Sequence, residues 1–291
     1  MHSHRSFHLV VFILLAISIT SCSGANNQVS EQYTPIPTAT EAPMAARVNG
    51  EGILLAEYQN ETLRLLAAQQ ELDIELDATQ QKEKVLHELI TQTLLAQGAA
   101  LQGHFIDEAT LQQRMDELAT EVGGVEKIAE WMAKYYYDET SFRYALRRNM
   151  AAAWMRDQII AEVGDTSDQV HVRQIRVDSQ AEAQSILQEL QGGSDFTALA
   201  KEYDPIIGGD LGWFPNGYLF QPEVDEAAFA LQPGQISEII STEIGYHIIL
   251  MVERDTQHAL TPDAKLFLQH QALDQWLAQK RAEANIEILV P

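Results

Sequence analysis

The sequence predicts an α+β protein, in which a helical module is completed by a C-terminal helix and strand and carries a small inserted α+β domain. Apolar residues recur at helical spacing through most of residues 54–163. From residue 170 the pattern changes to short strands and helices in the order β-α-α-loop-α-β-β. After residue 255 the helical spacing returns, and it ends in a short run of β-forming residues.

Length and charge limit the classes of protein to consider. The chain has 291 residues, 46 % of them hydrophobic, which is enough for roughly two domains with a core each. Its formal net charge of −23 argues against a nucleic-acid partner, whose phosphates would repel it. The charge favours solubility and basic or unfolded polypeptide clients, and a well-solvated acidic surface would explain it equally well.

The first 22 residues have the pattern of an export signal. Arg5 precedes the apolar run Leu9–Ile19, which is of signal-peptide length and short for a membrane span. Ile19-Thr20-Ser21-Cys22 resembles the bacterial lipobox, and Cys22 is the only cysteine, which excludes an internal disulfide. We therefore expect lipidation at Cys22 and an extracytoplasmic protein anchored to the cell membrane or outer membrane of a bacterium. The alternative is an ordinary signal peptide with a chance cysteine.

Residues 23–45 are expected to form a disordered tether, because they are polar, rich in proline and almost free of large apolar residues.

Residues 46–166 are expected to form the helical module. A hairpin is predicted at 46–53, because Asn49-Gly50 is a strong two-residue turn signal. Helices are predicted at residues 54–72, 79–101, 107–122, 125–136 and 139–163. Expected core residues of the first two helices are Tyr58, Leu63, Leu65, Leu66, Val85, Leu86, Leu89, Ile90, Leu94 and Leu95.

No catalytic constellation is present in the helical module. His87 and His104 are isolated histidines, which are more often surface or core residues than ligands. The triplet Tyr135-Tyr136-Tyr137 could line a peptide groove. Three adjacent aromatic residues on a helix point in different directions, so at least one of them is expected in the core.

Residues 167–256 are expected to form the inserted domain. Strands are predicted at residues 170–177, 235–240 and 246–253, and helices at 181–190, 196–200 and 223–230. The glycine-rich stretch Gly208–Phe214 (GGDLGWF) is expected to be a tight loop rather than a helix or a strand.

Residues 257–291 are expected to return to the helical module. Thr261-Pro262 starts a helix. Its predicted buried stripe is Phe267, Leu268, Ala272, Leu273, Trp276 and Leu277. The terminal strand Ile286–Val290 needs a partner, and we expect it to pair with the hairpin at 46–53.

The motifs of the inserted domain resemble those of parvulin-type peptidyl-prolyl isomerases. Gly208–Phe214, Ala227–Leu231 and Gly245-Tyr246-His247-Ile248-Ile249 occur in the family's order, and the likeness extends over the whole domain. The helical module resembles the N-terminal region of the SurA and PrsA foldases at Val48-Asn49-Gly50, His87–Ile90, Gly103 and Gly123-Gly124. The resemblance implies an isomerase that needs no cofactor or metal, with unfolded or proline-containing polypeptides as clients.

The parvulin resemblance also implies site residues. His247 matches the second histidine of the site's floor, Thr242 the floor hydroxyl, and Asp204 the Asp/Cys position beside the rotating bond. Gln174 stands where the family has its first histidine. The proline-binding residues would be Leu219 or Phe220, together with Val224 and Phe229.

Three positions depart from the family pattern. Gln174 replaces a histidine, Arg176 adds a charge on the same face of its strand, and Val224 is smaller than the usual aromatic residue. These departures favour a non-enzymatic chaperone, whereas Asp204, Thr242 and His247 favour an active isomerase of reduced rate. A plain envelope-scaffold lipoprotein is a third, more distant alternative, and dimerisation through the helical module stays open.

Overall fold

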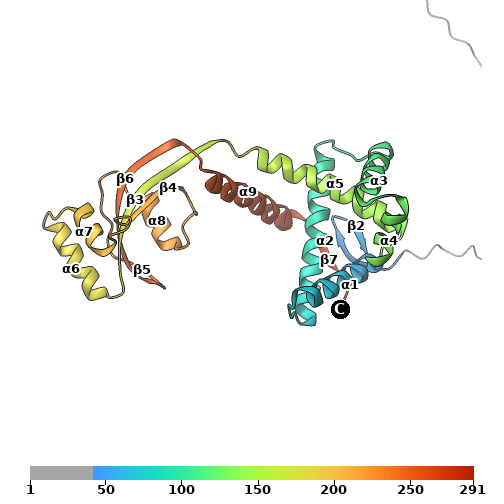
Figure 1. Ribbon diagram of the computed structural model, residues 1–291, viewed down its shortest axis with the longest axis horizontal. Helices are drawn as coiled ribbons and strands as arrows, with labels where there is room; N and C mark the ends of the chain where they lie inside the picture. Colours follow the sequence, from blue (N-terminus) through green and yellow to red (C-terminus); the bar gives the residue numbers. More distant parts are fainter. Residues whose placement is uncertain (1–41) are drawn as a thin grey trace, which may run out of the picture. The chain divides into compact units, whose positions relative to one another are not determined.

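The computed structural model describes residues 42–291 (Figure 1). The predicted signal peptide, Cys22 and most of the predicted tether lie outside these residues. Within residues 42–291, each helix is too short or too polar to cross a bilayer. The same residues contain no group of three or more His, Cys, Asp or Glu side chains placed to hold a metal ion.

A small three-stranded sheet joins the two ends of the described chain. It consists of β1 (Met44–Val48), β2 (Glu51–Leu54) and β7 (Ile286–Ile288), in the order β2-β1-β7. Asn49 and Gly50 form the predicted turn, both with positive φ (52° and 86°), as two-residue hairpins require. Because β7 pairs antiparallel with β1, the predicted partner of the terminal strand is confirmed.

Six helices surround this sheet or pack beside it: α1 (Leu55–Leu72), α2 (Ala78–Leu101), α3 (Glu108–Val122), α4 (Val125–Lys134), α5 (Glu139–Ala161) and α9 (Pro262–Glu283). Aspartate starts three of them. The side chains of Asp77, Asp107 and Asp138 each accept a hydrogen bond from the backbone N–H three residues on. Gly123 ends α3 in the left-handed conformation, at φ 100°.

The helical core follows the predicted stripe on α2, where Val85, Leu89 and Leu94 are buried with their neighbours. The prediction for α1 is partly wrong, because Leu63 and Leu66 are 41 % and 36 % exposed. Helix α1 packs on α2 and the hairpin along a narrow face, so residues one position outside that face remain in solvent.

Helix α9 packs on α5 and α2. Its predicted stripe is only partly buried, and Ala264 is its one fully buried residue. At Gly98 of α2, an added Cβ would lie 2.7 Å from the Trp276 ring of α9. Glycine at this position therefore lets the two helices meet.

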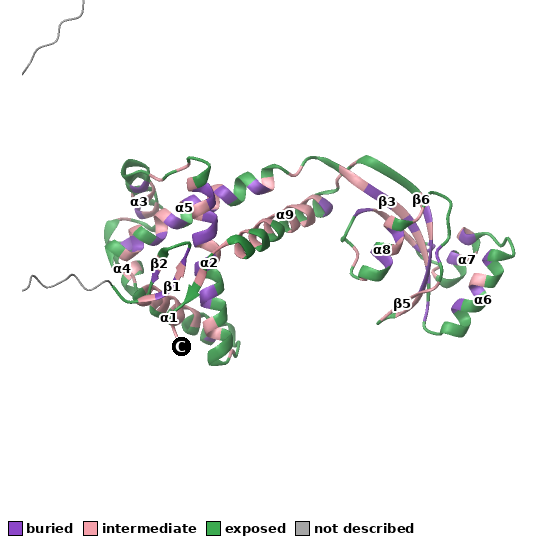
Figure 2. Ribbon diagram, turned by 180° about the vertical axis from the view of Figure 1, so that it is seen from behind, coloured by how far each residue is buried: buried purple, intermediate pink, exposed green. Residues whose placement is uncertain are grey.

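The second sheet consists of β3 (Thr166–Val177), β4 (Asp210–Pro215), β5 (Ile240–Thr242) and β6 (Gly245–Ala259), all antiparallel in the order β4-β3-β6-β5. Helices α6 (Gln180–Gln191) and α7 (Phe196–Tyr203) pack on one face, around Ile175 and Ile248. Helix α8 (Pro222–Ala230) packs on the other, around Ile249 and Met251. Figure 2 shows this layering as buried residues along β3 and β6 between exposed helix surfaces.

Two predictions in this domain are wrong. Gly208–Phe214 is not a loop throughout: only Gly208 and Gly209 turn, and Asp210–Pro215 is the edge strand β4. The apolar and aromatic residues after the glycines have a strand to pair with in β3, and that pairing outweighs the turn signal.

The predicted strand at residues 235–240 also differs, since β5 begins only at Ile240. The stretch before it runs beside β6, where the Ser237 hydroxyl accepts a hydrogen bond from the Ile249 N–H at 3.0 Å. A side chain thus takes the place of a ladder bond, which breaks the regular strand.

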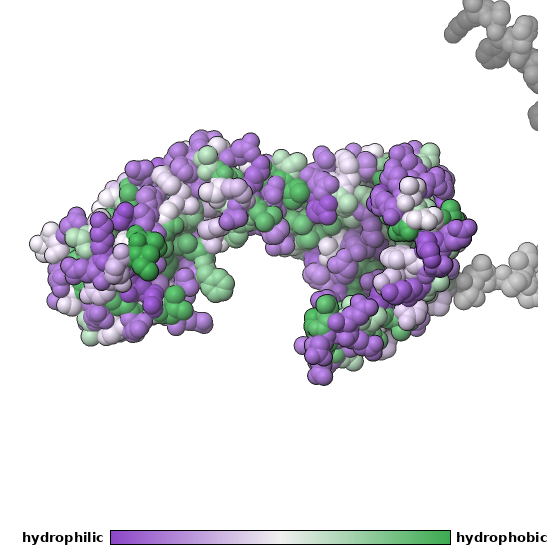
Figure 3. Space-filling view, viewed as in Figure 1, coloured by the Kyte–Doolittle hydropathy of each residue, from purple (hydrophilic) through white to green (hydrophobic). Residues whose placement is uncertain are grey.

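The surface of the chain is mixed in character. Hydrophilic residues dominate the face shown in Figure 3, and hydrophobic residues are scattered among them.

Candidate active site

His247 forms the centre of a hydrogen-bonded row on the α8 face of the second sheet. Its side chain is almost completely buried, at 1 % exposure. The imidazole Nε2 lies 3.0 Å from the Thr242 hydroxyl, and Nδ1 lies 3.0 Å from Gln174 Oε1. Three elements supply the row, because Gln174 is on β3, Thr242 on β5 and His247 on β6.

This arrangement assigns the protons of the row. Since Gln174 Oε1 can only accept, Nδ1 carries the hydrogen and donates it. Nε2 then accepts from the Thr242 hydroxyl, whose single hydrogen also lies within reach of Gly245 O, at 3.2 Å. The hydroxyl oxygen accepts from the Ile244 N–H at 3.3 Å. The neutral imidazole satisfies both partners.

The surroundings favour this neutral form. The pKa of His247 lies below its ordinary value, first because burial penalises the charged ring and second because the Arg176 guanidinium is nearby. Glu223 opposes the shift weakly. Arg176 pairs in register with His247 across β3 and β6, so the predicted shared face of Gln174 and Arg176 is confirmed. Its side chain is held at the edge, where it donates to Ile244 O at 2.7 Å.

Asp204 organises the loop that leads into β4. Its carboxylate accepts from the N–H groups of Ile206, Ile207 and Gly209, at 3.1, 3.3 and 3.2 Å. These bonds hold the pKa of Asp204 below its usual value, and the bond from the Ile207 N–H contributes most. Within the described residues no direct contact links Asp204 to His247. The connection runs through Gly209, whose carbonyl accepts from the Gln174 N–H at 2.8 Å.

Gly209 explains the double glycine. Its φ is +67°, and a Cβ at this position would lie 2.0 Å from the Gln174 carbonyl oxygen. Only glycine permits so close an approach. The motif therefore fixes the loop against the strand that carries Gln174.

An apolar cluster lies on the same face of the sheet as His247. Val224 is 2 % exposed within it, and Leu219 and Phe229 pack partly buried against it. Phe214 meets the Phe229 ring edge-to-face, with centroids 6.2 Å apart. Three of the four predicted proline-binding residues thus come together. Phe220 does not join them, since it is 95 % exposed.

Asp225 is a site-shaping residue that sequence reasoning missed. It is 3 % exposed, and its two oxygens accept from the N–H groups of Gly217 and Leu219, at 2.8 and 3.0 Å. The carboxylate therefore holds the loop that presents Leu219 and Phe220. In the sequence, an acidic residue in the first turn of a predicted helix is already explained by the helix dipole. Nothing in the sequence therefore indicates that Asp225 holds a loop.

His171 and Asp210 form a separate group beside β4. His171 Nε2 lies 2.7 Å from Asp210 Oδ1, and Arg173 donates to Asp210 Oδ2 at 3.0 Å. Burial works to raise the pKa of Asp210, but the Gly212 N–H and these two side chains hold it below its usual value. Trp213 stacks on His258, with ring centroids 4.0 Å apart. These contacts fix β4 to β3 and β6.

A sheet with a buried hydrogen-bonded histidine, beside an apolar cluster and a glycine-shaped loop, defines the parvulin class of domain. In agreement, residues 163–253 match the PPIC-type PPIASE domain, a rotamase family. Residues 1–156 match the SurA-like N-terminal domain, which covers more than half of the chain. The chain therefore belongs to the SurA-like N-terminal domain family and is a PrsA/SurA-like foldase with a PpiC-type rotamase domain.

Several foldases are similar to this chain. The foldase protein PrsA of Caldanaerobacter subterraneus is 29 % identical over 283 residues, which cover 82 % of this chain and 79 % of that protein. PrsA of Geobacillus kaustophilus is 38 % identical over 30 % of this chain and 32 % of its own length. The chaperone SurA of Burkholderia thailandensis is 33 % identical over 46 % of this chain and 31 % of its own.

Solved structures include similar chains. The crystal structure of peptidylprolyl isomerase PrsA from Bacillus cereus is 21 % identical, with 83 % of this chain and 88 % of that chain covered and a TM-score of 0.44. The solution structure of NmPin, the parvulin of Nitrosopumilus maritimus, is 37 % identical over 30 % of this chain and 98 % of that chain, with a TM-score of 0.28.

Proposed function

We propose that this chain is an exported peptidyl-prolyl cis/trans isomerase and chaperone that acts on unfolded, proline-containing polypeptides outside the cytoplasm. The row Gln174–His247–Thr242 beside the apolar cluster carries the proposal. His247, Thr242 and Gln174 would form the floor of the site, and Leu219, Val224 and Phe229 would hold the proline ring. Asp204 would act by holding its loop against the strand of Gln174. Phe220 lies outside the apolar cluster and would reach a substrate only from the exposed loop before α8.

The geometry suits rotation about a peptide bond. The uncatalysed barrier of about 18–20 kcal/mol requires no nucleophile, only a setting that favours the twisted amide over the planar one. An apolar surface strips water from the substrate carbonyl and so weakens amide resonance. The neutral, fixed imidazole offers the twisted amide an oriented polar group in place of water. The Arg176 charge on the same face is held at the edge, against Ile244 O.

The first test is catalytic. In a protease-coupled assay with a proline tetrapeptide, His247→Ala should lower kcat/KM by about 10–100-fold, equivalent to about 1.4–2.7 kcal/mol of transition-state stabilisation. His87→Ala, at an exposed histidine of α2, should match the wild type. If wild type and His247→Ala are equally slow, the enzymatic proposal is wrong.

A non-enzymatic chaperone is the second candidate. The observation that favours it is Gln174 bonded to His247 where the family pattern has a histidine, with the Arg176 charge alongside. Suppression of aggregation of an unfolded client by both the wild type and His247→Ala, without isomerase activity in either, would select it. We propose weak isomerase activity as the outcome, because the buried row remains complete.

We further propose that Cys22 is lipidated and anchors the chain to a bacterial membrane through a tether at residues 23–45. The support is the lipobox-like sequence Ile19–Cys22 and the absence of any other cysteine. Cys22→Ala should move the protein from the membrane fraction to the soluble extracytoplasmic fraction in a bacterial host. Retention of the variant in the membrane fraction would contradict the anchor.

A further inference from the structure

The loop between β4 and α8, residues 216–221, carries Leu219 and Phe220 and is held by two different parts of the chain. The first is α8, whose buried Asp225 carboxylate accepts from the Gly217 and Leu219 N–H groups. The second is α9, which follows the second sheet along the chain. We call residues 216–221 the β4–α8 loop.

Helix α9 contacts this loop through an aromatic pair. The Phe267 ring meets the Tyr218 ring edge-to-face, with centroids 5.3 Å apart and an angle of 87° between the ring planes. Aromatic rings prefer this arrangement, because the positive edge of one ring lies against the negative face of the other. Tyr218 directly precedes Leu219, so the pair fixes the loop next to a proposed proline-binding residue.

Gly217 fits the loop closely to α9. Its φ is +81°, which glycine adopts without strain. A Cβ at this position would lie 3.1 Å from Gln271 Nε2 and 3.7 Å from Phe267 Cζ, both on α9. A side chain here would crowd the helix, so glycine allows the loop to approach Phe267.

The start of α9 is fixed to the chain that enters β3. The Leu260 N–H donates to Asp165 O at 2.8 Å, and Lys265 Nζ lies 2.5 Å from the Asp165 carboxylate. Ala264, in the first turn of the helix, is 2 % exposed. These contacts hold the turn that precedes Phe267 close to the first residues of β3, and they give the Tyr218–Phe267 pair a fixed support.

Packing of the helical core does not account for Phe267. Among the described residues, the α9 side chains that pack on the core of α2 and α5 are Ala272, Leu273, Trp276 and Leu277. Phe267 precedes Trp276 by nine residues, which is about two and a half turns and places the two side chains on opposite faces of the helix. One face of α9 thus packs on the helical core, and the other meets the β4–α8 loop.

We propose that Phe267 is a positioning residue for the isomerase reaction, because its ring holds the β4–α8 loop, through Tyr218, in the conformation that binds the substrate proline. This inference rests on the proposed isomerase function and adds to the site a residue from outside the parvulin domain. Without the contact, a substrate would have to order the loop as it binds. Leu219 would hold the proline ring equally in the planar and the twisted amide, so the loss should raise KM and leave kcat nearly unchanged.

The kinetic test varies the concentration of a proline tetrapeptide in the protease-coupled assay, with the full chain. Phe267→Ala should raise KM about three- to fivefold and change kcat by less than about 1.5-fold. Tyr218→Ala should do the same. The double variant should show no larger rise in KM than either single variant, because both remove one contact. Tyr218→Phe keeps the ring and should retain the KM of the wild type.

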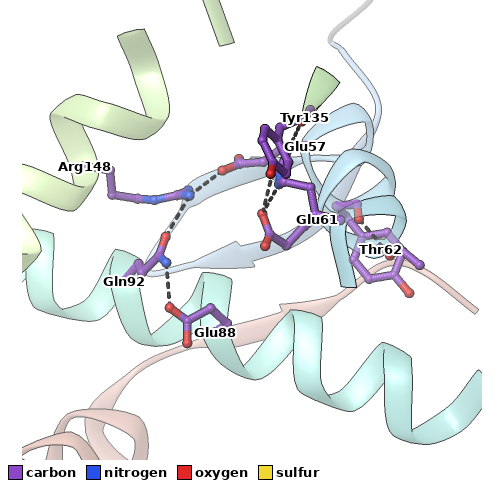
Figure 4. A network of polar contacts seen from close by, with 9 residues as sticks. Glu57, Glu61, Thr62, Glu88, Gln92, Tyr135 and Arg148 are labelled. Carbon is purple, nitrogen blue, oxygen red and sulfur yellow. Dashed lines mark hydrogen bonds and ion pairs between the residues drawn. The ribbon is translucent and has the colours of Figure 1, made fainter. Parts of the chain in front are cut away.

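Two controls separate positioning from general effects. Leu266→Ala, at a neighbouring residue of α9 that is 52 % exposed, should leave KM unchanged. Glu57→Gln weakens the buried pair with Arg148 inside the helical module, which Figure 4 shows together with Gln92. It should destabilise that module without raising KM, so a rise in Phe267→Ala would not be a result of lower stability.

Hydrogen exchange, measured by mass spectrometry, follows the loop without catalysis. Backbone N–H groups of residues 216–221 should exchange at least about threefold faster in Phe267→Ala than in the wild type, and at the wild-type rate in Leu266→Ala. Faster exchange together with a raised KM is the expected result.

An unchanged KM in Phe267→Ala, or an equal rise in Glu57→Gln, would overturn the proposal, whatever the exchange rates. A wild type that does not accelerate isomerisation would instead refute the proposed enzymatic function. The Kd of the same tetrapeptide, measured by calorimetry, then takes the place of KM. A Kd that is equal for the wild type and Phe267→Ala would overturn the positioning role.

Discussion

His247 is the residue on which the chemistry of the proposed site depends, and its environment makes that chemistry sensitive to pH. The pKa of the ring lies below its ordinary 6.5, because burial and the Arg176 charge disfavour the protonated form. In the folded chain the ring therefore stays neutral to a lower pH than in the unfolded chain. Neutrality is what the hydrogen bond from Thr242 to Nε2 requires.

This shift predicts a pH dependence with a definite sign. Below about pH 6.5 the unfolded chain binds a proton at residue 247 that the folded chain does not, so the folded state loses stability as the pH falls through this window. The difference in free energy of unfolding between wild type and His247→Gln should shrink from about pH 7.5 to about pH 5.5, measured by urea denaturation. Parallel curves for the two proteins would contradict the assignment. Because the folded ring stays neutral at the start of this window, kcat/KM of the wild type should fall only at lower pH, once the folded ring is protonated.

The sequence predicts which residues form the hydrogen-bonded row around His247, but not how the loop residues beside that row are arranged. Alternation along the strand placed Gln174 and Arg176 on the His247 face, because that geometry is local. The exposure of Phe220 and the loop-holding role of Asp225 depend on how residues 216–221 fold against α8. No local pattern carries that information.

Among helices and strands, too, the features set by local sequence are predicted, and those set by tertiary contacts are not. The helices were predicted well, since aspartate caps and periodic apolar residues act within one helix. The sequence predicts a loop where strand β4 lies, because the glycines before it are a strong turn signal and its partner β3 lies more than thirty residues earlier. Pairing over that distance cannot be read from the segment itself.

The Arg148–Glu57 pair predicts a large cost for removing one partner, because it joins α5 to α1 in a buried setting. Arg148→Met leaves an uncompensated carboxylate and should lower the free energy of unfolding by about 3–5 kcal/mol. The double variant Glu57→Gln/Arg148→Met should recover much of this loss.

The matched control for this pair lies on the same helix. Arg156 pairs with Asp157 in solvent, with both side chains at least half exposed. Arg156→Met should change the free energy of unfolding by no more than about 0.5 kcal/mol. If chemical denaturation gives equal losses for Arg148→Met and Arg156→Met, the buried pair does not join the helices as described.

At the scale of the whole molecule, segments from the two ends of the described chain complete one structure. Strand β7 pairs with β1, and α9 packs on α5 and α2, with Trp276 against Gly98. We propose the division that this connectivity supports: a helical module at 46–166, a parvulin domain at 167–256 and a returning segment at 257–291. Sequence reasoning reached the β7 pairing because an isolated strand must find a partner, and the first hairpin offered a free edge.

This division predicts how a shortened chain behaves. A chain ending at Leu260, just after β6, would lose α9 and β7 and expose the apolar surface they cover. Its helical module should melt at a lower temperature than that of the full chain, followed by circular dichroism, whereas the isomerase activity of the second sheet should persist. Equal melting temperatures would show that the returning segment does not complete the helical module.

The pairing of β7 with β1 also sets an order of events during synthesis. The second sheet is built from a contiguous stretch, so it can fold as soon as that stretch has emerged. The first hairpin emerges earlier, yet its sheet is complete only once β7, which follows the second sheet along the chain, has been made. Until then the edge of β1 is open to other strands, including those of a client or of a second copy emerging nearby.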